Sequence, residues 1–263
     1  MSAAESGTLA SGAAIASPGK PWGFWATLGL SLVILCVWIV VQVIVTILYL
    51  LFAAPPSGSG TFKLPNGTTF PAFDNGTLLA ISTLTTGILL PPLCLLCAAL
   101  KPGISAKDYL GLRAVPLRQM IAWLALTVLL CAASDTLTWS LGRQVIPDFM
   151  IQTMNSVVSE PLLWIAVIVG APLFEEFFFR GFLFAGLRNS RLGSVGAVLL
   201  TTVAWASLHI QYDLFQIAIL FIVGLTLGYA RIRTGSLAVP LAMHAVNNLL
   251  ATLEASVYLH FLK

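Results

Sequence analysis

The chain has 263 residues, of which 58% are hydrophobic and 9% are charged, and its formal net charge is +3. An average globular protein carries about 25% charged residues, so this chain has too few to cover a water-soluble surface. We interpret it as an integral membrane protein. The small net charge gives no reason to expect a nucleic-acid partner.

The order of the predicted elements follows from hydropathy. Residues 1–20 are small and polar, which predicts a disordered N-terminal tail, and residues 21–263 are predicted to form one helical membrane domain. A helix needs ~20 apolar residues to cross a bilayer. Stretches that meet or approach this length are 22–52, 78–100, 119–141, 161–187, 194–210, 214–230 and 236–262. The expected fold is an all-α membrane protein, a single bundle of about seven transmembrane helices.

Basic residues predict how the bundle is oriented. With seven helices, one side holds nine of the thirteen basic residues: Lys20, Lys101, Lys107, Arg113, Arg118, Arg188, Arg191, Arg231 and Arg233. The other side holds Lys63, Arg143 and Lys263, and Arg180 lies within a helix. Because cytoplasmic loops carry an excess of Lys and Arg, we expect a multi-pass protein of the bacterial cell membrane. Its N-terminus would be cytoplasmic and its C-terminus would lie outside.

Cys94 and Cys97 form a CxxC motif inside the second apolar stretch. Such a pair can serve metal or redox chemistry. No second CxxC is present to complete a zinc site, and buried cysteines commonly act as small packing residues. We interpret the pair as packing residues.

Glu175, Glu176 and Arg180 interrupt the fourth apolar stretch. A charge at the centre of a membrane helix costs at least ~2.5–3.5 kcal/mol on insertion scales, so these groups require a polar cavity, a partner or a proton. Glu176 and Arg180 are four residues apart and are predicted to form an ion pair on one helix face. Glu175 points about 100° away and is free to meet another helix.

Two histidines and an asparagine extend this polar set. His209 ends the fifth stretch, and His244 and Asn248 share one face of the seventh. A carboxylate and imidazoles around a water can activate it, directly or through a metal, and the Asn248 amide can donate to a developing oxyanion. We therefore expect these residues and Glu175 to converge on one cavity from three helices.

Structural explanations exist for each of these residues taken singly. A lone membrane histidine usually forms an interhelical hydrogen bond, and a Glu–Arg pair is more often structural than catalytic. Two other functions stay open from the sequence. One is a non-proteolytic membrane factor that binds a partner or a lipidated peptide; the other is a proton-coupled transporter using Asp135, Glu175 and His209 as a relay.

The order of three motifs resembles that of the CPBP intramembrane proteases, which include type II CAAX prenyl endopeptidases and bacteriocin-processing or Abi proteins. The motifs read Glu175-Glu176-Phe-Phe-Phe-Arg180, Trp205-Ala-Ser-Leu-His209 and His244-Ala-Val-Asn-Asn248. The resemblance covers about residues 165–250, within a predicted protease-like core at about 160–262. It departs in one place, because Trp205 stands where the family usually has phenylalanine.

The resemblance implies an endopeptidase that hydrolyses a peptide bond of a membrane-associated or prenylated, CAAX-like protein, in a cavity that opens to the cytoplasm. It implies Glu175 as general base, with His209 holding the water or metal. His244 and Asn248 would stabilise the oxyanion, and Glu176 and Arg180 would orient Glu175. Where a divalent metal such as zinc is used, its ligands would be Glu175, His209 and His244; a metal-free water activated by glutamate is the other option.

Overall fold

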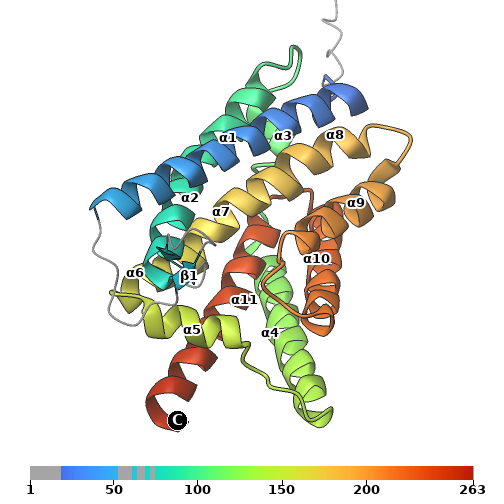
Figure 1. Cartoon of the computed structure of the whole chain (residues 1–263). Coiled ribbons are helices and arrows are strands. Elements are labelled where there is room, and N and C mark those ends of the chain that lie inside the picture. The colour runs from blue at the N-terminus through green and yellow to red at the C-terminus, as the bar shows by residue number, and fades with distance from the viewer. Residues whose placement is uncertain (1–18, 53–60, 64–68, 72–74, 263) are drawn as a thin grey trace, which may run out of the picture.

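The structure is a computed structural model that describes residues 19–52, 61–63, 69–71 and 75–262. It is a bundle of helices (Figure 1). The long helices are α1 (Phe24–Phe52), α2 (Gly76–Ala99), α4 (Leu117–Ser140), α9 (Gly193–Ser207), α10 (Leu214–Thr234) and α11 (Ala238–Val257). The predicted disordered tail lies outside the described residues, apart from Gly19 and Lys20.

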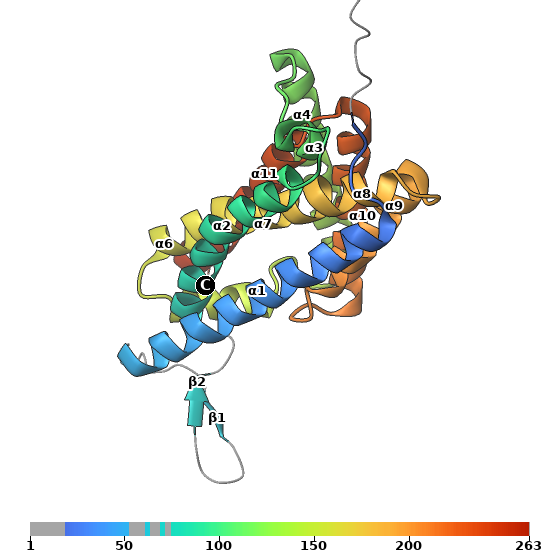
Figure 2. The same cartoon turned by 90° about the horizontal axis from the view of Figure 1, so that it is seen from above.

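Shorter elements connect these helices. They include α3 (Ala106–Leu110), α5 (Asp148–Ser156) and a terminal π-helical turn, η3 (Tyr258–Leu262). The strands β1 (Thr61–Lys63) and β2 (Thr69–Pro71) pair antiparallel, and this hairpin projects from the bundle beside α1 (Figure 2). It lies between the first and second predicted apolar stretches, 22–52 and 78–100.

The all-α membrane class is confirmed, because helices occupy all seven predicted stretches. Five of them are long and apolar enough to cross a membrane: α1, α2, α4, the helix over Glu160–Arg188, and α10. Helix α9 has only 15 residues, and α11 is not among the five, so the count of seven crossings stays a prediction. Large apolar side chains on α1, such as Ile39, Val43 and Ile47, are about half exposed, as expected for a lipid-facing surface.

The helix over Glu160–Arg188 is continuous but changes its hydrogen-bond register twice. Its parts are α6 (Glu160–Ile165), η1 (Ala166–Gly170), α7 (Ala171–Glu175), η2 (Glu176–Leu183) and α8 (Phe184–Arg188), and η1 and η2 are π-helical. Pro172, just after η1, has no N–H for the helical ladder. Helix α2 passes η1 so closely that a Cβ on Gly87 would lie 2.6 Å from the Gly170 carbonyl oxygen. This interrupted helix carries Glu175 and Glu176 at the junction of α7 and η2.

One end of the bundle gathers the arginine-rich connections. We call residues 19–23, 99–118, 188–193 and 231–237 the basic end. The Asn189 side chain donates to the Pro21 carbonyl at 3.3 Å, the Leu237 N–H donates to the Gly111 carbonyl at 2.8 Å, and Arg231 Nη2 donates to the Leu110 carbonyl at 3.0 Å. The three basic loops therefore lie together on one side, as the charge pattern predicted.

The opposite, distal end is formed by residues 75–77, 141–160, 208–213 and 258–262. The Val158 N–H donates to Thr77 Oγ1 at 2.9 Å, Arg143 pairs with Asp213, and His260 Nε2 lies 3.4 Å from Glu160 Oε1. Asp213 is the N-cap of α10 in a capping box. The Gln216 backbone N–H, with Arg143 beside it, holds the pKa of the Asp213 carboxyl below its usual value.

Candidate active site

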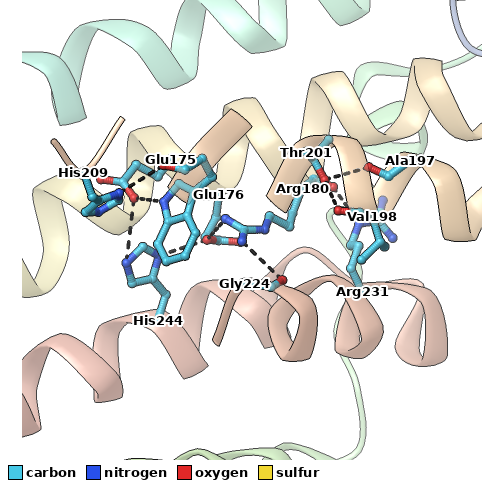
Figure 3. A network of polar contacts seen from close by, with 11 residues as sticks. Glu175, Glu176, Arg180, Ala197, Val198, Thr201, His209, Gly224, Arg231 and His244 are labelled. Atoms are coloured by element: carbon cyan, nitrogen blue, oxygen red, sulfur yellow. Dashed lines mark hydrogen bonds and ion pairs between the residues drawn. The ribbon is translucent and has the colours of Figure 1, made fainter. Parts of the chain in front are cut away.

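The predicted Glu176–Arg180 pair forms at the centre of the bundle, and it has a third member. Arg180 Nη1 lies 2.9 Å from Glu176 Oε1, and the two side chains are 1% and 0% exposed. The same Glu176 oxygen lies 2.9 Å from His244 Nδ1. Arg180 Nη2 also donates to the Gly224 carbonyl at 3.4 Å. Figure 3 shows these groups as one polar network between η2, α10 and α11.

Glu175 points away from that pair, as the helix geometry predicted, and meets two residues of other helices. Its Oε2 accepts a hydrogen bond from Trp205 Nε1 on α9 and lies 3.8 Å from His244 Nε2 on α11. Glu175 is 20% exposed and His244 is 4% exposed. His244 is therefore placed between both glutamates, one at each ring nitrogen (Figure 3).

Trp205 is the centre of the aromatic packing around these groups. It is 2% exposed, and the Arg180 guanidinium lies over its ring at 4.7 Å from the centroid. The rings of His209 and His244 meet it edge-on, with centroid distances of 4.8 and 5.5 Å. A cation over a tryptophan face is stabilised by the ring quadrupole, so Trp205 connects the buried ion pair to Glu175.

His209 and Asn248 complete the predicted set. His209 Nδ1 lies 3.0 Å from the Trp205 carbonyl oxygen; an Nδ1–H donated to that carbonyl leaves Nε2 as the free nitrogen. Asn248 Nδ2 donates to the Val167 carbonyl at 2.9 Å, which uses one of its two N–H groups.

Glu175, His209, His244 and Asn248 line one cavity of about 330 Å³. Trp205 and Asn247 also border it, and the remaining wall mixes apolar side chains with hydroxyl, amide and carboxyl groups. A concave apolar pocket with a few convergent polar groups is the usual form of a binding or catalytic site. The predicted convergence from three helices is what the structure shows.

The contacts change two of the expected roles. Glu176 and Arg180 were expected to orient Glu175, but Glu176 contacts His244, and the partner of Glu175 is Trp205. From the sequence, Trp205 was noted only as a replacement for the family's usual phenylalanine. The signal was present, because tryptophan has an N–H donor that phenylalanine lacks.

The predicted metal ligands are Glu175, His209 and His244. Glu175 and His244 face each other, but no group of three His, Cys, Asp or Glu side chains in the described part of the chain is arranged to hold a metal ion. The donor set therefore does not fit a three-ligand zinc site.

Fold and site together define a class: an all-helical integral membrane protein with carboxylate and imidazole groups facing a cavity inside the bundle. Residues 157–250 match the family model described as type II CAAX prenyl endopeptidase Rce1-like. This part of the chain, about a third of its length and the part that carries the three motifs, is therefore similar to a protease-type family.

One curated relative was found. An uncharacterized 24.3 kDa protein of Escherichia coli is 34% identical over 92 residues, which are 34% of this chain and 42% of that protein. The match thus spans less than half of the relative's length. No solved structure matches the chain.

Proposed function

We propose that the protein is an intramembrane endopeptidase that hydrolyses a peptide bond of a membrane-associated protein with a water activated by Glu175. One observation carries this proposal. Glu175 Oε2 and His244 Nε2 face each other across 3.8 Å at the wall of the cavity. A water at ordinary hydrogen-bond distance from both atoms would bridge them from the cavity side, at the corner of a triangle whose base is this separation.

The tautomer of a neutral His244 follows from its contact with Glu176. With Nδ1–H donated to Glu176, neutral His244 presents the lone pair of Nε2 toward Glu175. A water donating one hydrogen to each acceptor turns an oxygen lone pair to the cavity. In the proposed reaction that oxygen attacks the scissile carbonyl carbon while Glu175 takes the water's proton. Glu175 then passes the proton to the amide nitrogen as the C–N bond breaks.

The developing oxyanion needs a donor inside the cavity. Asn248 is the proposed donor, through the N–H that the Val167 carbonyl does not use. His244 Nε2 holds the water, so His244 moves from the oxyanion role implied by the resemblance to a water-holding role, while His209 lines the same cavity with its own acceptor Nε2. Arg180 offsets the charge of Glu176, which allows Glu176 to fix the His244 ring.

A cleavage assay tests the proposal directly. The full chain, reconstituted in lipid, is incubated with a library of membrane-anchored peptides that includes prenylated CAAX peptides, and products are identified by mass spectrometry. We expect new peptide termini with wild type and none above background with Glu175→Gln. Equal products from both proteins would overturn the enzyme assignment and favour a binding factor. Metal analysis of the same preparations tests the zinc option, because a resident ion would be lost with His244→Ala.

We expect Trp205→Phe to lower kcat about tenfold with little change in KM, because a hydrogen bond to a charged group contributes roughly 1.5–3 kcal/mol. The variant keeps an aromatic ring in place but removes the donor to Glu175. The matched control is Trp123→Phe, whose ring packs edge-on against Tyr229 at 5.9 Å, away from the cavity lining. If both variants lose kcat equally, Trp205 has only a packing role.

A further inference from the structure

The cavity belongs to one end of the bundle. Around Glu175, His209 and His244, its wall includes residues 144–147, 149–150, 211–212 and 215–216 and Glu254. These segments belong to the distal end or adjoin it. None of the cavity-lining residues comes from the basic end.

The half of the bundle toward the basic end has a tightly packed apolar core. Phe178, Phe182 and Phe184 are at most 1% exposed and belong to one apolar cluster with Trp205 and Leu227. Arg231, 3% exposed, bridges the Arg180 and Leu110 carbonyls at 3.0 Å each. This packing separates Glu175 from the arginine-rich loops.

The length of α9 explains why the opposite half is open. Its 15 residues extend only about 22 Å, whereas the hydrocarbon core of a bilayer is about 30 Å thick. The helix starts at the basic end and stops at Ser207, so the turn to α10, at the distal end, follows a short helix and His209 borders the same cavity as Glu175. The space that a longer α9 would fill becomes part of the cavity.

We infer that the active-site cavity opens on the extracytoplasmic face of the membrane, so that the substrate is a polypeptide segment reaching Glu175 from that side. Nine of thirteen basic residues lie at the other end or in the tail leading to it, and such loops are retained in the cytoplasm. The expected cytoplasmic N-terminus and the expected cytoplasmic opening therefore cannot both hold for this chain. The excess of basic residues at the basic end favours the cytoplasmic N-terminus over the cytoplasmic opening. The nature of the substrate rests on the proposed function, but the side on which the cavity opens rests on geometry and charge alone.

The charged side chains that line the cavity limit the kinds of substrate it can bind. Asp135, Glu175 and Glu254 line it, and no Lys or Arg does so among its lining residues. A free C-terminal carboxylate close to the scissile bond would meet acids without a cation, which is unfavourable at low dielectric. The substrate is thus a neutral or basic internal segment of an exported or membrane-inserted protein, and not a short CAAX terminus.

Single-cysteine labelling tests the opening. Gln211→Cys and Gln144→Cys place thiols on exposed cavity-lining positions, and Asn189→Cys places one on an exposed position of the basic end. A membrane-impermeant maleimide is applied to bacterial spheroplasts and to inverted vesicles, with the wild-type chain as the baseline for its own four cysteines. We expect several-fold more labelling of the two cavity variants in spheroplasts, and of Asn189→Cys in inverted vesicles. The reverse pattern overturns the inference.

A second measurement separates the opening from the proteolysis. A single-pass membrane reporter protein carries the same uncharged segment either on the extracytoplasmic side or in the cytoplasm. The Glu175→Gln variant is the negative control. Cleavage only of the external segment supports the inference, whereas cleavage only of the cytoplasmic one overturns it. If neither is cut while labelling follows the expected pattern, the proposed function and the substrate fail but the direction of the opening stands.

Discussion

Replacing Glu175 by glutamine is expected to lower kcat by about 10²–10⁴-fold, the usual contribution of a general base. The amide has nearly the shape of the carboxylate and can still accept the Trp205 N–H, so the fold should persist. It cannot take a proton from the water that we place between Glu175 and His244. The measurement is single-turnover cleavage of a peptide found in the library assay, at equal amounts of folded protein.

Glu160→Gln is the matched control for this change. Glu160 lies at the start of the same long helix, is 38% exposed and contacts His260 at 3.4 Å. Its replacement should leave kcat within about twofold of wild type, since surface ion pairs contribute little. A Glu175→Gln protein with more than a tenth of wild-type activity would show that another group is the base.

The largest expected effect on stability comes from Arg180→Met. Removing one partner of a buried ion pair costs about 3–5 kcal/mol, because the other charge stays buried and uncompensated. Glu176 is fully buried, and its second oxygen has no hydrogen-bond partner among the described residues. Unfolding of the purified protein in mixed micelles should therefore shift strongly toward lower denaturant concentration.

Two companion variants make the stability prediction specific. In the Glu176→Gln/Arg180→Met double variant no charge is left alone, so much of the lost free energy of unfolding should return. Arg113→Met removes the arginine of an exposed pair with Asp108 at 3.2 Å and should change little. If Arg180→Met and Arg113→Met unfold alike, the buried pair is not a source of stability.

The sequence predicted the class of fold and most of the site because both depend on local spacing. Apolar runs marked the helices, and the i to i+4 positions of Glu176 and Arg180 placed them on one face. The convergence of Glu175, His209 and His244 followed from the cost of polar groups in lipid. The spacing and the cost of each polar group are properties of single helices, which one sequence can reveal.

Contacts between helices could not be predicted in this way. Whether Glu176 orients Glu175 or His244 depends on how α11 is rotated against η2, and the π-helical register of η2 shifts its side chains from the ideal 100° spacing. The Trp205–Glu175 hydrogen bond depends equally on the approach of α9. The seven-crossing count depends on α9 and α11, whose length or composition departs from a simple membrane span.

The unequal lengths of α1 and α9 also concern the surrounding lipid. Helix α1 has 29 residues and would extend about 43 Å, nearly twice the reach of α9, so one uniform bilayer cannot match both. Lipid acyl chains beside the exposed Val195 and Val203 of α9 must shorten or become disordered, while α1 must tilt away from the bilayer normal. Hydrophobic mismatch is thus built into this protein, and the thickness of its host bilayer helps to set how far the headgroups lie from Glu175.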